Sequence, residues 1–252
     1  MITWTGKKHF ELGDTSFRLV NFQESHVKAG DDAQIIFKER WMIERYTHLF
    51  TRIKPQNIVE LGIHQGGSAV FFHKLAESPK LVAIELNENR IESLDSYIRD
   101  HGLETSLIPV HGVNQADNHR VSRILDEEFG DRMIDLVIDD ASHFLDETRA
   151  SFNTIFPRLR PGAAYIIEDW SWAHADAGAP DDSPGFYPER EPLTKLLFEI
   201  VLACGSTRNL INRVEIDNNS AIIWRGTASL AAGEFDIASS CLARGRNLVS
   251  IG

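Results

Sequence analysis

Cysteine and long apolar runs are scarce in this chain of 252 residues. The two cysteines, Cys204 and Cys241, lack the spacing of metal-binding pairs, and we expect reduced thiols in a cytoplasmic protein. No window approaches the roughly 20 apolar residues of a membrane span, and the N-terminus lacks a signal-peptide core. Positive charge is also in short supply. The net charge of −11 argues against nucleic acid or an anionic membrane as partner.

What is present is an ordinary globular composition, with 42% hydrophobic and 25% charged residues. A chain of this length can bury a large core within one α/β domain. We therefore expect a single domain over residues 1–252. It would comprise an N-terminal extension with helices (1–54), a core (55–225) and a C-terminal tail (226–252).

Short apolar runs alternate with amphipathic stretches through the core. Strands are expected at 57–61, 80–85, 106–111, 134–139 and 164–168. Helices are expected between them, at 67–77, 88–101, 119–129 and 145–158. Strands separated by helices of this length indicate βαβ units and a parallel sheet.

The two ends of the chain differ from this alternation. Residues 210–216 and 221–225 are strand-like, and the Asp-Asn-Asn-Ser segment between them predicts a β-hairpin. Residues 32–53 carry apolar side chains at helical spacing. The predicted fold is α/β. It has a Rossmann-like, doubly wound, mostly parallel seven-stranded sheet with a C-terminal antiparallel hairpin and an N-terminal helical extension.

Carboxylates follow two of the expected strands directly. Asp139 and Asp140 close the strand at 134–139, and Glu168 and Asp169 close the next one. Ligands bind at this edge of an open α/β sheet. Because neighbouring acids repel one another, a hard divalent cation with oxygen ligands is the natural occupant. His143, three residues after Asp140, is a candidate general base.

A glycine-rich turn follows the first strand of the core. It runs from Glu60 through Gly62 to Gly66, Gly67 and Ser68, where a helix is expected to open. Glycines let the backbone approach a ligand, and a helix N-terminus presents unpaired N–H groups. The acid at the start would repel a pyrophosphate but suits a cationic amino group. The turn lacks the dinucleotide pattern G-x-G-x-x-G, so an ordinary βα turn is an equally good interpretation.

Further polar residues follow the next two strands. Glu85 is placed to accept hydrogen bonds from both hydroxyls of a ribose, or simply to begin the following helix. Gln115 and Asp117 stand where an adenine could be bound by amide and carboxylate groups. Asp117 is equally suited to cap the helix at 119–129.

Together these motifs resemble those of class I S-adenosylmethionine-dependent methyltransferases. The Asp-Asp-x-Ser-His segment at 139–143 and the Glu-Asp pair at 168–169 are more narrowly similar to the macrocin O-methyltransferase family. Cephalosporin-hydroxylase-type proteins share this pattern. The resemblance covers residues 55–225. It implies a Mg²⁺-dependent enzyme that methylates sugar hydroxyls of macrolides and other glycosylated natural products.

The resemblance also implies roles for single residues. Asp140, Glu168 and Asp169 are expected to hold Mg²⁺, and His143 to act as the base. The residues expected to bind S-adenosylmethionine are Glu60, Gly62, Gly66, Gly67, Ser68, Glu85, Gln115, Asp117 and Asp139. We expect a small-molecule substrate and a homo-oligomer.

Three other interpretations stay open at this point. A catechol-type O-methyltransferase has a similar set of acids but a lysine where His143 stands. A cephalosporin-type hydroxylase would bind iron, although the two-histidine triad of such enzymes is not evident. A non-catalytic nucleoside-binding domain would need no metal. Residues 173–188 are rich in Gly, Pro and Asp and are expected to form a lid over the acceptor, with Phe186 and Tyr187 as aromatic contacts.

Overall fold

The fold is described from a computed structural model, which defines residues 2–24, 26–28, 33–77, 79–174, 190–243 and 246–247. The chain divides into two compact units, residues 1–113 and 114–252. Of the expected lid, Ala173 and His174 lie in a short 3-10 helix. The rest of the lid, including Phe186 and Tyr187, lies outside the described residues.

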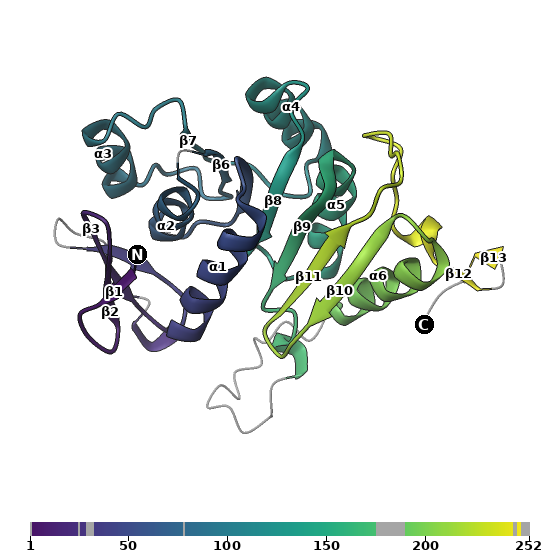
Figure 1. The fold of residues 1–252 in the computed structure, drawn as a ribbon, viewed down its shortest axis with the longest axis horizontal. Coiled ribbons are helices and arrows are strands. Elements are labelled where there is room, and N and C mark those ends of the chain that lie inside the picture. The colour runs from purple at the N-terminus through teal and green to yellow at the C-terminus, as the bar shows by residue number, and fades with distance from the viewer. Residues whose placement is uncertain are drawn as a thin grey trace. The chain divides into compact units, whose positions relative to one another are not determined.

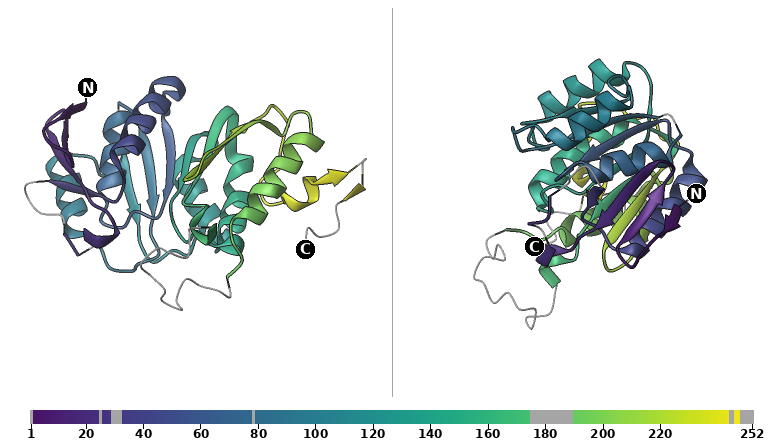
Figure 2. Two further views of the ribbon diagram at one scale, coloured as in Figure 1. Left: turned by 90° about the horizontal axis from the view of Figure 1, so that it is seen from below. Right: turned by 90° about the vertical axis from the view of Figure 1, so that its left-hand side faces the viewer.

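The N-terminal unit begins with a small four-stranded sheet, drawn in purple in Figures 1 and 2. Its strands are β1 (Ile2–Trp4), β2 (His9–Leu12), β3 (Thr15–Leu19) and β4 (Gln34–Ile36). Strands β1 to β3 are antiparallel, and β4 runs parallel to β3. The helical spacing over residues 32–53 therefore places the helix too early, because residues 34–36 form strand β4 and helix α1 (Arg40–Ile53) begins only at residue 40.

Aromatic packing explains why these residues form strands. Phe10 and Phe17 lie on adjacent strands and are completely buried. Their rings stack at 4.9 Å, and both meet the edge of Phe71 on helix α2 (Gly67–Leu75). In a strand, alternate residues share one face, so this face is buried and mostly apolar while the residues between are exposed or half-buried. The alternation of apolar and polar residues is short in these strands, so their contact with α2, rather than the sequence pattern, determines that they form a sheet.

The rest of the N-terminal unit follows the expected alternation. It contains β5 (Asn57–Leu61), α2, β6 (Lys80–Ile84), α3 (Glu92–Asp100) and β7 (Leu107–Val110). The three strands are parallel neighbours, with Leu61 opposite Ile84 and Ile84 opposite Val110. Because the strands end level, the turn after β5 and Glu85 after β6 come to the same edge.

The C-terminal unit contains four strands in the order β10-β11-β9-β8. Its elements are α4 (Asn118–Phe129), β8 (Ile134–Asp139), α5 (Leu145–Ile155), β9 (Leu159–Glu168), α6 (Thr194–Ser206), β10 (Ile211–Ile216) and β11 (Ser220–Arg225). Strands β8 and β9 are parallel, whereas β9, β11 and β10 are antiparallel. Helix α6 packs on β10 (Figure 1).

Helix α6 is absent from the sequence-based expectations. Its apolar residues lie on all sides: Leu197 and Ile200 are buried, but Phe198 and Val201 are about half exposed. Such a segment has no clear polar face, so the helical period is hidden.

Short elements complete the described structure: 3-10 helices at Phe22–Glu24, Phe156–Arg158, Trp172–His174 and Ala238–Ser240, and the two-stranded pair Leu242–Ala243 and Arg246–Asn247.

The expected α/β class is confirmed. The seven expected core strands are present and mostly parallel, and β10 and β11 form the expected antiparallel hairpin. Within the part of the chain that the structure describes, every helix is too short or too polar to cross a bilayer.

Candidate functional site

Two acids and a histidine come together at one end of strands β8 and β9. Asp140 directly follows β8, and Asp169 directly follows β9. Because these parallel strands are neighbours, their carboxyl ends meet at one edge. Asp140, His143 and Asp169 each offer a ligand atom, and these atoms all lie within 4.8 Å of one another. The His143 Nε2 atom lies 3.9 Å from Asp140 Oδ1. We call these three residues the acid–histidine cluster.

The backbone at two cluster residues adopts a left-handed conformation that side chains seldom tolerate. The φ angle is 57° at His143 and 51° at Asp169. Such residues cost free energy of order 1–3 kcal/mol each and gather at functional sites. Both receive support: the Trp172 indole N–H donates to the His143 carbonyl at 2.8 Å. The Asn219 side-chain amide donates to Asp169 Oδ1 at 2.5 Å. The surrounding structure thus holds both side chains toward one point.

Glu168 does not join the acid–histidine cluster. It is the last residue of β9, is 1% exposed and lies opposite Ser220 of β11. Consecutive residues at a strand end point in different directions, and the turn at Asp169 sends only the second acid into the cluster. The sequence predicts three acids together, and the structure brings two of them together with the histidine.

A buried hydrogen-bond network lies directly behind the cluster. Asp139 accepts hydrogen bonds from the Tyr165 hydroxyl at 2.7 Å, the Ser151 hydroxyl at 2.8 Å and the Gln115 amide at 3.2 Å. Burial raises the pKa of the Asp139 carboxyl to about 6, and the two hydroxyl donors act in the opposite direction. Burial likewise raises the pKa of Tyr165 above its ordinary value. We call these four residues the buried network.

The buried network changes how the third expected loop is interpreted. Gln115 and Asp139, expected to bind cofactor, are 6% and 2% exposed and bind each other. Asp117 caps helix α4, because its Oδ1 accepts from the Arg120 N–H at 3.0 Å. Sequence reasoning missed Ser151 and Tyr165, which sit among apolar residues of a helix and a strand. The signal available was a polar residue at a position that the pattern of the helix or strand buries.

The N-terminal unit holds the other acids expected to bind cofactor. Glu60 lies within β5 and is completely buried. Glu85 is half-buried, and each of its oxygens accepts one backbone hydrogen bond. The donors are the Ile63 N–H at 3.0 Å and the Asn87 N–H at 2.9 Å. Glu85 therefore ties the turn after β5 to the end of β6, and carboxylate lone pairs are left for further donors.

The glycines of this turn have a packing reason for their small size. Gly66 precedes α2 with φ at 82°, and a Cβ there would lie 2.8 Å from the Leu94 side chain. A Cβ on Gly67 would lie 2.1 Å from the Ile35 carbonyl oxygen of β4. Gly62 also has a positive φ, of 79°, and Ser68 is half-buried in the first turn of α2. Both the fold and a ligand could require these glycines.

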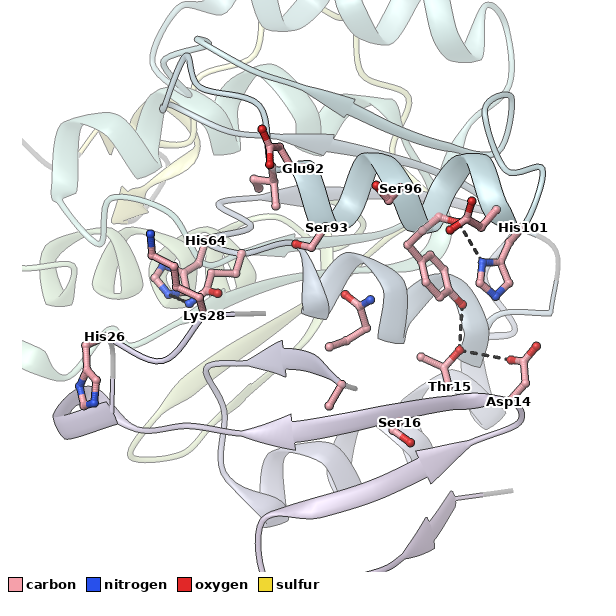
Figure 3. Close-up of a pocket in the computed structure, with 16 residues that line it drawn as sticks. Asp14, Thr15, Ser16, His26, Lys28, His64, Glu92, Ser93, Ser96 and His101 are labelled. Carbon is pink, nitrogen blue, oxygen red and sulfur yellow. Dashed lines mark hydrogen bonds between the residues drawn. The ribbon is translucent and has the colours of Figure 1, made fainter. Parts of the chain in front are cut away.

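An open hollow of about 1090 Å³ lies within the N-terminal unit (Figure 3). Polar side chains of β3, α3 and the turn after β5 line it, including Ser16, Ser96, His64 and Gln65. The Gln65 amide donates to the Val27 carbonyl at 2.7 Å. Glu60 and Glu85 are not among the described residues that line this hollow. The His64 and Gln65 side chains of the turn thus line this hollow, and Gln65 contacts the N-terminal segment.

Known proteins that resemble this chain are methyltransferases. Residues 59–170 match the family described as a methyltransferase domain. The tetracenomycin-pathway 8-demethyl-8-(2-methoxy-alpha-L-rhamnosyl)-tetracenomycin-C 3'-O-methyltransferase of Streptomyces olivaceus is 32% identical over 51% of this chain and 32% of its own length. Mycinamicin VI 2''-O-methyltransferase of Micromonospora griseorubida is 30% identical over 60% of this chain and 35% of its own. The chain thus spans about a third of the length of these curated relatives.

Solved structures agree at the level of the fold. The MycE methyltransferase from the mycinamycin biosynthetic pathway, in complex with Mg, SAH and mycinamycin VI, has a TM-score of 0.56 at 22% identity. The match covers 76% of this chain and 51% of that one. The resemblance to methyltransferases that the motifs indicate is confirmed. Residues 59–170 of this chain match the methyltransferase-domain family, and the chain shares its fold with this solved methyltransferase.

Proposed function

We propose that this chain is an S-adenosylmethionine- and Mg²⁺-dependent O-methyltransferase that methylates a sugar hydroxyl of a glycosylated natural product. The acid–histidine cluster carries this proposal, because it sits at the ligand-binding edge of two parallel strands in a methyltransferase domain. The curated relatives are named as O-methyltransferases of sugar-bearing natural products.

The side chains of the cluster fit a divalent cation. Asp140 and Asp169 supply hard carboxylate oxygens close together, which suits Mg²⁺. Glu168, buried at the end of β9 and outside the cluster, is left out of the proposed ligand set. Such a cation supplies Lewis acidity toward an acceptor hydroxyl and orients it, and a sugar hydroxyl is too weakly acidic to ionise unaided. A vicinal diol is the acceptor that we expect, because two neighbouring hydroxyls could both bind such a cation.

His143 is proposed as the general base. Its side chain is 28% exposed, so an acceptor can reach it. Its Nε2 atom would take the proton of the acceptor hydroxyl, a task to which the histidine imidazole is suited. The Trp172 indole fixes the His143 carbonyl, which limits rotation of the backbone that carries the imidazole. Histidine rather than lysine at this position argues against a catechol-type enzyme.

The turn after β5 and the end of β6 are proposed to bind S-adenosylmethionine. The sulfonium and amino groups of this cofactor are cationic and suit an acid-lined edge, with Glu60 near the amino group. Glu85, which two backbone N–H groups hold in place, is proposed to accept hydrogen bonds from the ribose hydroxyls. The remaining residues proposed for this site are Gly62, Gly66, Gly67 and Ser68.

The acceptor is proposed to be a small molecule. The net charge of −11 disfavours nucleic acid and anionic membranes as partners. A homo-oligomer and a cytoplasmic location, in antibiotic biosynthesis, complete the proposal.

Titration calorimetry tests the proposed cofactor and metal together. S-adenosylmethionine should bind with or without Mg²⁺, and Mg²⁺ should be needed for methyl transfer to glycosylated natural products. A requirement for iron in place of Mg²⁺ would indicate the hydroxylase. Cofactor binding without any metal binding or turnover would indicate a nucleoside-binding domain.

A further inference from the structure

One buried amide uses both of its ends inside the C-terminal unit. Gln115 lies just before α4, and its Nε2 donates to Asp139 Oδ1 at 3.2 Å and to Ser151 Oγ at 3.0 Å. Its Oε1 accepts the backbone N–H of Ser142 at 2.9 Å. Ser142 stands between Asp140 and His143. A single side chain therefore ties a buried carboxylate to the loop that carries two members of the acid–histidine cluster.

The other end of this tie is also fixed. The Tyr165 hydroxyl of β9 and the Ser151 hydroxyl of α5 both donate to Asp139 Oδ2. The four side chains of the buried network are 6% exposed or less. A buried carboxylate is costly unless donors surround it, and connected hydrogen bonds in a low-dielectric interior strengthen one another. The buried network is thus a stiff support.

The loop above this support needs stiffness. The Ser142 hydroxyl accepts the Phe144 N–H at 3.3 Å, and His143 holds a left-handed backbone conformation. Without the bond to Gln115, the Ser142 N–H would be free to turn toward water, and the strained loop would relax. A displacement of about 1 Å in a reacting group can cost a hundredfold in rate.

We propose that Gln115, with Asp139, Ser151 and Tyr165, is a positioning set that holds the loop from Asp140 to His143 for cation binding and proton transfer. These residues support the loop from behind and do not contact the cofactor, contrary to the sequence-based expectation for Gln115 and Asp139. The inference rests on the proposed roles of the loop residues.

Two variants of the full chain test this inference. Gln115→Met removes both ends of the tie at similar length, and Tyr165→Phe removes one donor without changing shape. Tyr97→Phe is the matched control, since its buried hydroxyl bonds Thr15 in the N-terminal unit. The readouts are amide hydrogen exchange at Ser142, affinity for Mn²⁺, affinity for S-adenosylhomocysteine, and kcat with KM.

The expected result is selective. Gln115→Met should speed exchange at Ser142 at least tenfold and weaken Mn²⁺ binding and kcat by about 10–100-fold, the usual effect of removing an outer partner of a metal ligand. Tyr165→Phe should shift the same quantities less. S-adenosylhomocysteine affinity should stay within about twofold of the unmodified chain, and Tyr97→Phe should change none of these quantities.

Two results would overturn the inference. Weaker S-adenosylhomocysteine binding with unchanged Ser142 exchange would return Gln115 to the cofactor site. Unchanged exchange, Mn²⁺ affinity and kcat in both variants would make the network a spectator of the core. Failure of the proposed function looks different, because the unmodified chain would then bind no Mn²⁺. In that case, slow amide exchange at Ser142 in the unmodified chain and fast exchange in Gln115→Met would still show that Gln115 holds the loop from Asp140 to His143.

Discussion

The turn after β5 and the loop after β8 both follow a buried parallel strand, but different contacts hold them. In the turn, most of these contacts join backbone groups: the Gly66 N–H donates to the Ile63 carbonyl at 2.6 Å and the Gly62 N–H to the Ile84 carbonyl at 2.8 Å, while the Glu85 carboxylate accepts from the Ile63 N–H. In the loop, the supporting groups are side chains from distant segments, Gln115 and Trp172. Damage to the turn should therefore affect folding and cofactor affinity, and damage to the loop should affect chemistry.

The largest expected effect is the loss of turnover when a carboxylate of the acid–histidine cluster is neutralised. Asp140→Asn or Asp169→Asn should lower turnover by about a thousandfold or more, because each removes a charged oxygen ligand from the proposed cation. A chelator should abolish turnover in the unmodified chain, and added Mg²⁺ should restore it. S-adenosylmethionine affinity, measured by calorimetry, should survive in both variants. Asp146→Asn, an exposed acid on α5, is the control. Full activity in a chelator would remove the metal site.

Next in size is the loss of the proposed base. His143→Ala should lower kcat by roughly 10²–10⁴, the usual contribution of general base catalysis, while cation and cofactor still bind. The loss should shrink as pH rises, since more of the acceptor is ionised without help. A pH–rate profile from 6 to 10 checks this. Near-full activity of His143→Ala at neutral pH contradicts the base assignment.

A smaller effect is expected on the turn side. Glu85→Ala should weaken S-adenosylmethionine binding by about 10–150-fold, which corresponds to charge-assisted hydrogen bonds worth about 1.5–3 kcal/mol. Mn²⁺ affinity should not change, in contrast to the aspartate variants. Glu88→Ala, an exposed acid three residues away, is the control. If both acids can be removed without loss of cofactor affinity, the ribose assignment fails.

The smallest expected effect separates folding from ligand binding in the turn. Gly67→Ala should lower the free energy of unfolding by about 1–3 kcal/mol, because the new methyl group would overlap the Ile35 carbonyl. Gly205→Ala, in helix α6 with open space around it, should raise stability by about 0.5–1 kcal/mol. Urea denaturation measures both. Equal stability of Gly67→Ala and the unmodified chain would leave only a ligand as the reason for this glycine.

The parts of the fold that could be predicted from the sequence are those with a clear local pattern of apolar residues. Strands β5 and β8 begin and end at the expected residues, because apolar runs bounded by acids or glycine mark them. The N-terminal sheet and helix α6 could not be found in this way. The strands of the N-terminal sheet hold few apolar residues, and those of α6 lie on all sides of the helix. Packing against α2 and β10, respectively, therefore determines that these segments form a sheet and a helix.

The sequence by itself determined where the candidate reactive groups lie along the chain: acids at the ends of β8 and β9, a histidine three residues after Asp140, and a glycine turn after an acid. These features depend only on neighbours along the chain and on the rule that parallel strands end at one edge. Tertiary structure alone decided which acid of the Glu168–Asp169 pair joins Asp140 and His143. The left-handed backbone at Asp169 turns that residue, and not Glu168, into the cluster. It also decided that Gln115 and Asp139 bond each other, because burial leaves each polar group to find its partner inside the protein.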